Sequence, residues 1–214
     1  MDDTTLPRQA RLREARAHLR HADPAIRQLI DAHPEFDPRA WLAELPPMDA
    51  FGTLVFQIIG QQLSVRATRQ LLTRLQDQFA GQLPTPAQLL DADPNKLHAA
   101  GLSRRKSQTI RSVAAEFQSQ RITEKALRAM SDAEIETRLT TIPGIGPWTV
   151  HGLLIIALER DDVVLPGDLA LRKAIQRSYG LDHLPSQEEV LHIAEPWRPY
   201  RTLASAYLFA TAFE

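Results

Sequence analysis

The sequence has no cysteine, no long apolar run and almost no excess of charge of either sign. Without cysteine there is no disulfide, no zinc–thiolate site and no cysteine-held iron–sulfur cluster, which fits a reducing cytoplasm. The longest apolar run, 150–158, is far too short to span a bilayer. Residues 1–5 are acidic and polar, so we expect no signal peptide. A net charge of −1 argues against a strongly basic nucleic-acid coat but leaves local basic patches open.

What the sequence does have is a succession of helix signals. Its 214 residues, 43% hydrophobic and 24% charged, suit one large or two small globular domains. Asp23-Pro24 has the pattern of an N-cap followed by proline at the first helical position, and residues 131–134 have that of a capping box. Apolar residues in 50–61 recur at helical spacing, and no segment alternates as a strand would. We therefore predict an all-α fold of about ten helices.

The turn Pro143-Gly144-Ile145-Gly146-Pro147 joins two of these helical patterns. Gly144 and Gly146 permit positive φ and leave backbone N–H groups uncovered, while Pro147 opens the next helix without wasting a donor. Free N–H groups at a helix N-terminus form an anion site that needs no positive side chain. The turn lacks the lysine of a P-loop, and it lacks the third glycine and preceding strand of a dinucleotide fingerprint. A purely structural corner between two helices is the alternative.

A lone carboxylate, Asp168, opens the next helix about twenty residues later, after Pro166 and Gly167. It is either only an N-cap or also a group that does chemistry beside the turn. The joint pattern of helix, Pro-Gly-Ile-Gly hairpin, helix and Pro-Gly-Asp resembles the helix-hairpin-helix (HhH-GPD) superfamily of DNA glycosylases. Segments 58–65, 101–106 and 197–201 further resemble its alkylation-repair branch, 3-methyladenine DNA glycosylase II.

This resemblance implies two helical lobes with the active-site cleft between them. We expect a central lobe at 50–160, including the hairpin at about 132–158, and a composite lobe of 1–49 plus 161–214. Larger bacterial members carry an extra N-terminal α/β domain, and we expect this chain to be a compact member without it. The expected partner is damaged double-stranded DNA. We expect the protein to act as a monomer in the cytoplasm, associated with the nucleoid. No membrane and no organic cofactor are implied.

The resemblance also implies an activity. Asp168 matches the catalytic aspartate, which stabilises the positive charge that develops on the sugar as the glycosidic bond breaks. Lyase members of the superfamily keep a lysine nucleophile at the position of Trp148, so we expect no lyase activity. The expected reaction is excision of alkylated bases of the 3-methyladenine and 7-methylguanine type, leaving an abasic site. The alternatives are another lesion specificity within the superfamily and a non-catalytic hairpin that only binds DNA.

Further residues receive roles by the same resemblance. Trp148, Phe209, Tyr207 and Leu169 are expected in the base pocket, with a place in the hydrophobic core as the alternative for the three aromatics. Either Gln62 or Leu63 is expected to be the wedge that fills the gap left by a flipped base.

The phosphate contacts are expected at the hairpin and on a basic segment. Residues 101–128 hold seven Lys or Arg against two Glu. The phosphate-binding candidates are Gly144, Gly146, Arg104, Arg105 and Lys106. A monovalent cation, Na⁺ or K⁺, is expected at the backbone carbonyls of Thr140, Ile142 and Gly144.

Overall fold

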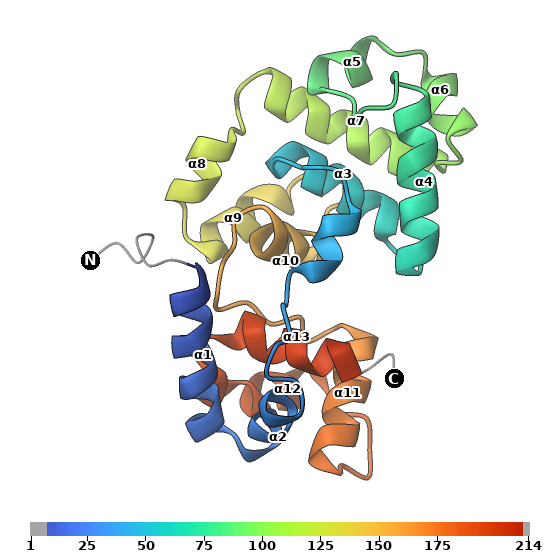
Figure 1. Cartoon of the computed structure of the whole chain (residues 1–214). Coiled ribbons are helices and arrows are strands. Elements are labelled where there is room, and N and C mark those ends of the chain that lie inside the picture. Colours follow the sequence, from blue (N-terminus) through green and yellow to red (C-terminus); the bar gives the residue numbers. More distant parts are fainter. Residues whose placement is uncertain (1–7, 212–214) are drawn as a thin grey trace. The chain divides into compact units, whose positions relative to one another are not determined.

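The computed structural model describes residues 8–211, apart from the side chains of Pro94 and Thr211. Within that range the chain forms thirteen α-helices and no β-strand, so the predicted all-α class is confirmed (Figure 1). The α-helices are α1 Arg8–Ala22, α2 Pro24–Ala32, α3 Ala50–Gly60, α4 Val65–Asp77, α5 Pro86–Asp91, α6 Pro94–Ala99, α7 Arg104–Gln118, α8 Glu124–Ala129, α9 Asp132–Leu139, α10 Pro147–Ile156, α11 Leu169–Tyr179, α12 Gln187–Ile193 and α13 Arg201–Thr211. Two short 3₁₀ helices are η2 Ala40–Glu44 and η3 Glu195–Trp197.

Most helix starts lie where the N-cap residues predict them. The side chain of Asp49 accepts from the Gly52 N–H, that of Ser64 from Ala67 and that of Ser103 from Lys106. Residues 40–44 form the short 3₁₀ helix η2 and not an α-helix. None of the helices within 8–211 is long and apolar enough to cross a membrane.

The chain divides into two compact units. Unit 2, residues 42–159, is built around α3, in which every residue from Ala50 to Ile59 is buried. Helices α4, α7 and α10 pack against α3 (Figure 1). A helix that is apolar all round belongs in the centre of a helical core, and this one holds the hairpin helix α10 on one side and the basic helix α7 on another.

Unit 1 combines residues 1–41 with residues 160–214. Its helix pairs α1–α2, α2–α13 and α11–α13 pack together, so both ends of the chain contribute to one core. Asp23, only 5% exposed, is the N-cap of α2 and also accepts hydrogen bonds from the Tyr179 hydroxyl at 2.6 Å and the Trp197 indole at 3.0 Å. Burial and the neighbouring carboxylate raise the pKa of Tyr179. Asp23 thereby connects α2 to α11 and η3.

Candidate functional site

The hairpin between α9 and α10 is a short turn anchored by two buried isoleucines. Ile142 and Ile145 are 7% and 6% exposed, and the Ile145 N–H donates to the Ile142 carbonyl at 3.0 Å. Gly146 is the N-cap of α10 and offers no side chain to the first turn of the helix. The N–H groups of Gly144 and Gly146 make no hydrogen bond with the described residues. The turn therefore has the donors of an anion site at a helix N-terminus.

Thr109 of α7 and Gln61 at the end of α3 hold this turn in place. The Thr109 hydroxyl lies 3.1 Å from the Pro143 carbonyl. The Gln61 amide donates to the Gly144 carbonyl at 3.0 Å and to the Thr149 hydroxyl at 2.9 Å. The sequence does not predict these contacts, because the partners lie 34 to 88 residues apart in the chain.

Lys106 makes two contacts within the protein that the sequence did not predict. Its ammonium group donates to the carbonyls of Ile59 at 2.7 Å and Gln61 at 2.9 Å, and burial lowers its pKa. It therefore closes the C-terminal end of α3, where carbonyls lack helical partners, and positions the loop that follows. An ammonium group has three donors, so one remains for a phosphate and the expected phosphate contact stays a prediction. Arg104 and Arg105 are exposed, and their guanidinium groups make no hydrogen bond or ion pair with the described residues.

The loop that Lys106 holds contains both wedge candidates. Gln62 has a φ of +60° and Leu63 is 41% exposed. The Leu63 N–H donates to the Gly60 carbonyl at 3.0 Å, which closes the turn between α3 and α4. Both side chains are exposed at this turn, so Gln62 and Leu63 both remain candidates for the wedge.

Two of the carbonyls expected at a cation already accept hydrogen bonds. The Ile142 carbonyl accepts from Ile145 and the Gly144 carbonyl from Gln61. A carbonyl oxygen has two lone pairs, so each retains one acceptor position for a cation. The expected monovalent cation at this turn stays a prediction.

Asp168 stands at the N-terminus of α11 in unit 1. Its Oδ1 accepts hydrogen bonds from the backbone N–H groups of Ala170 at 2.9 Å and Leu171 at 3.0 Å. The N-cap interpretation is therefore correct, and it is compatible with chemistry because an ionised carboxylate offers about four acceptor positions. The cap fixes the orientation of the carboxylate relative to α11.

The candidates for a base pocket fall into two groups. Trp148 and Leu169 are 39% and 53% exposed, and Phe209 is half-buried. Tyr207 differs, because it is completely buried, its hydroxyl accepts from Arg16 at 2.9 Å and its ring lies 4.9 Å from that of Phe36. The core alternative is correct for Tyr207, and we withdraw it from the pocket.

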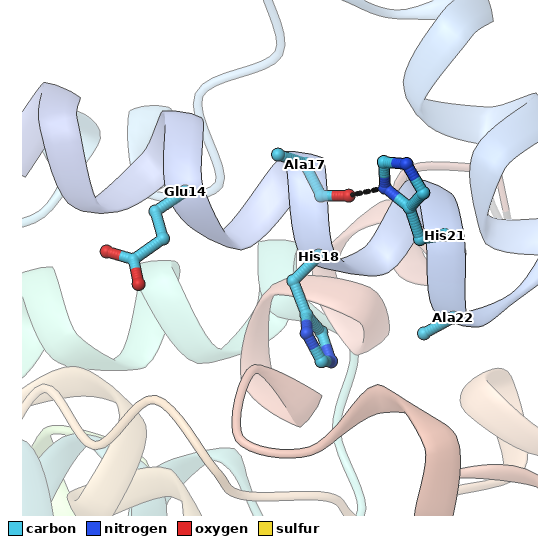
Figure 2. A pocket seen from close by; sticks show the side chains of 5 residues that line it. All are labelled: Glu14, Ala17, His18, His21 and Ala22. Atoms are coloured by element: carbon cyan, nitrogen blue, oxygen red, sulfur yellow. Dashed lines mark hydrogen bonds between the residues drawn. The ribbon is translucent and has the colours of Figure 1, made fainter.

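A separate surface hollow lies along α1, lined by residues of that helix alone (Figure 2). His18 and His21 both line it, and the His21 ring is hydrogen-bonded to the Ala17 carbonyl at 2.7 Å, drawn as the dashed line in Figure 2. Among the described residues no group of three or more histidines and acidic side chains could hold a metal ion.

An all-α core that carries a glycine-rich hairpin between two helices, followed by a helix capped by aspartate, is the arrangement of a helix-hairpin-helix protein. The model of the HhH-GPD superfamily of base excision DNA repair proteins matches residues 55–199, and the chain belongs to this family.

Relatives extend the match over nearly the whole chain. DNA-3-methyladenine glycosylase 1 of Schizosaccharomyces pombe is 32% identical over 203 residues, 94% of this chain and 88% of that protein. DNA-3-methyladenine glycosylase 2 of Escherichia coli is 28% identical over 176 residues, 77% of this chain and 58% of that protein. The structure of the S. pombe 3-methyladenine DNA glycosylase in complex with abasic DNA superimposes with a TM-score of 0.85, covering 94% of this chain and 97% of that one, at 30% identity.

Proposed function

We propose that this chain is a monofunctional DNA glycosylase that excises alkylated bases from double-stranded DNA in base excision repair and leaves an abasic site. The observation that carries the proposal is Asp168, a carboxylate held by two backbone N–H groups at the start of α11. The hairpin supports it, because the N–H groups of Gly144 and Gly146 make no hydrogen bond with the described residues and are suited to a phosphate. The similarity to glycosylases that are named for 3-methyladenine supports the choice of substrate class.

The reaction is a hydrolysis at the C1′ atom of the deoxyribose. The bond between C1′ and the base nitrogen breaks, and its electron pair leaves with the base. The sugar passes through an oxocarbenium-like state whose positive charge Asp168 stabilises. A water oxygen then forms the new bond to C1′ and loses a proton, for which the carboxylate can be the acceptor.

Alkylation itself explains why few catalytic groups are needed. A base alkylated at N3 or N7 is cationic, so the departing electron pair neutralises its ring, and no general acid need protonate it. Trp148, at the start of α10, supplies an aromatic face for such a cation. Tryptophan has no amine, so residue 148 cannot form the Schiff base through which a lyase cleaves the backbone.

DNA binding is assigned to the hairpin of unit 2. The N–H groups of Gly144 and Gly146 at the start of α10 are suited to a phosphate, and the exposed Arg104 and Arg105 on α7 can add contacts to the backbone. Backbone donors carry no net charge, so this mode of binding is compatible with a chain of net charge −1. We expect a monomer that needs no organic cofactor.

The decisive experiment compares wild type with Asp168→Asn on methylated duplex DNA. Asparagine is as good an N-cap as aspartate, whereas Asp168→Ala loses the cap at about 0.5–2 kcal/mol, so only the asparagine variant removes the charge without removing the cap. We expect wild type to release methylated purines and Asp168→Asn to lose nearly all release while retaining affinity for DNA. Asp182→Asn is the matched control, because the Asp182 side chain is 98% exposed in the same unit.

The outcomes separate the proposal from its rivals. No base release from any damaged duplex, with DNA binding intact, would leave the non-catalytic hairpin module as the function. Release of oxidised or mismatched bases in preference to methylated ones would assign another specificity within the superfamily. Equal activity of Asp168→Asn and wild type would remove Asp168 from the catalytic role.

A further inference from the structure

The first turn of α13 holds the segment that leads to Asp168. Residues 160–163, which we call the strap, precede Asp168 in the chain and lie against the start of α13, all within unit 1. The Thr202 N–H donates to the Asp161 carbonyl at 2.9 Å. The Thr202 hydroxyl donates to the Arg160 carbonyl at 2.8 Å and accepts from the Val163 N–H at 3.0 Å. Thr202 therefore contacts the backbone of three of the four strap residues.

The remaining strap residue is Asp162. The Arg201 side chain contacts both the carboxylate and the backbone carbonyl of Asp162. Its guanidinium contacts Asp162 Oδ1 at 2.6 Å, Oδ2 at 3.1 Å and the backbone carbonyl at 2.7 Å. The Arg201 side chain is only 13% exposed. Arg198 contacts the same carboxylate at 2.5 Å but is 47% exposed and makes no hydrogen bond to the strap backbone. The planar Arg201 guanidinium bonds to the carboxylate and the carbonyl at once and so fixes the orientation of Asp162. The exposed ion pair with Arg198 does not fix it in this way.

The path from the strap to Asp168 leaves little freedom. Val163, Val164 and Leu165 are all buried, between 4% and 8% exposed. The Asp168 N–H then donates to the Leu165 carbonyl at 3.0 Å, and the Asp168 carboxylate caps α11. The segment 163–168, which joins the strap to α11, is buried at residues 163–165 and forms a turn at Leu165–Asp168. A displacement of the strap along α13 would therefore be transmitted to the start of α11.

We propose that Arg201 and Thr202 are positioning residues for the reaction, which fix the strap and through it the placement of the Asp168 carboxylate. This inference rests on the proposed function, since it assigns Asp168 the catalytic role. The proposal assigns a role to Arg201, the second arginine of the segment Trp-Arg-Pro-Tyr-Arg, and to its partner Asp162. A carboxylate that must face a developing charge tolerates little displacement, and a misplacement of about 1 Å can cost about 100-fold in rate.

The test is Thr202→Val, which keeps the shape of threonine and removes all contacts of the hydroxyl, with Thr202→Ser as the conservative rescue. Arg201→Met removes the buried fork, and Arg198→Met is its matched control at the exposed position. Each variant is assayed by single-turnover release of methylated purines with the full chain in excess over duplex DNA. Its affinity for an unreactive duplex and its thermal midpoint are measured in parallel.

We expect Thr202→Val and Arg201→Met to lower the single-turnover rate by ~10- to 100-fold while their affinity for DNA stays within about twofold of wild type. Thr202→Ser and Arg198→Met are expected to remain near the wild-type rate. A folded Thr202→Val with the wild-type rate would overturn the proposal, as would a loss of DNA affinity equal to the loss in rate. If wild type itself releases no base, or Asp168→Asn remains active, the proposed function fails instead, so the two failures are distinguishable.

Discussion

The hydroxyl of Thr109 fills the space beside Gly144 in which any other residue would place its β-carbon. A Cβ built on Gly144 would lie 2.1 Å from Thr109 Oγ1 and 3.0 Å from its Cγ2, far inside contact distance. Gly144 also has a φ of +91°, a region that L-residues rarely adopt. Two independent constraints, one from the backbone and one from α7, therefore require glycine at this point of the hairpin.

Gly144→Ala should consequently destabilise the protein and lower its affinity for DNA. We expect a loss of ~2–4 kcal/mol in the free energy of unfolding, because the left-handed φ adds strain and the contact with Thr109 forces α7 or the turn to move. Gly146→Ala is the matched control for stability, since a Cβ there meets nothing within 4 Å. Denaturant unfolding measures the difference, and equal stabilities of the two variants would contradict it.

The turn between α3 and α4 exposes both wedge candidates, and alanine variants of Gln62 and Leu63 decide between them. If Gln62 is the wedge, Gln62→Ala should slow the release of methylated bases from a duplex by ~10-fold, because nothing then fills the gap and offsets the cost of unstacking, a few kcal/mol. The loss should be much smaller on a single-stranded substrate, which has no stack to fill. Gln120→Ala is the control, since Gln120 is also an exposed glutamine with a positive φ, +57°. A larger loss for Leu63→Ala than for Gln62→Ala would assign the wedge to Leu63.

The cap of α12 should make stability depend on pH. Hydrogen bonds from the Ser186 backbone, His183 and the Ser186 hydroxyl lower the pKa of Glu189 from 4.5 to about 2. Hydrogen bonds to Asp182 and Glu189 raise that of His183 above 6.5. A lowered carboxyl pKa stabilises the fold above pH 4.5 and ceases to do so as the pH falls towards 2. A raised histidine pKa stabilises it below pH 6.5 and ceases to do so as the pH rises through the raised value.

Glu189→Gln should therefore cost most stability between about pH 4.5 and pH 6.5, where both charges are present. Glutamine keeps the hydrogen-bonding pattern of a capping box, so the change removes mainly the charge. Thermal midpoints of wild type and variant should converge on acidification below pH 4.5. Glu188→Gln, in the same first turn of α12 but without a hydrogen bond in the described part of the chain, should show a smaller effect. A difference between wild type and Glu189→Gln that grows towards pH 3 would contradict this account.

The parts of the structure that the sequence predicts are those decided by neighbouring residues. The caps at Asp23, Ser103 and Ser131 lie where they were expected because each contact spans only two or three residues. Gly180 likewise ends α11 in the left-handed conformation that its position predicts.

The contacts that the sequence did not predict join residues far apart in the chain. Lys106 looked like a surface cation in a basic segment, but the carbonyls that it contacts lie 45 and 47 residues away. Tyr207 suited a pocket equally well in the sequence, and only its contact with Arg16, 191 residues away, decides for the core. The strap contacts of Arg201 and Thr202 span about 40 residues, which no local pattern predicts.

Trp148 carries the prediction that separates base removal from backbone cleavage. Treatment of wild type and methylated duplex DNA with borohydride should trap no covalent adduct, because no amine stands at residue 148. An adduct would show a Schiff base and contradict the monofunctional assignment. Lysine elsewhere in the chain is tested by the same experiment.

Replacement of Trp148 tests its contact with the base. Trp148→Ala should lower the rate of release of cationic methylated purines by ~10- to 100-fold, since stacking on an aromatic face is worth ~1–3 kcal/mol per base. The thermal midpoint should change little, because the side chain is 39% exposed. Trp41→Ala is the control, as Trp41 has a nearly equal exposure, 38%, and no assigned role. Trp148→Phe should retain most of the rate, because a phenyl ring still stacks. If instead Trp148→Ala and Trp148→Phe lose stability together and the release rate per folded molecule is unchanged, Trp148 is a packing residue of α10 and the base is held elsewhere.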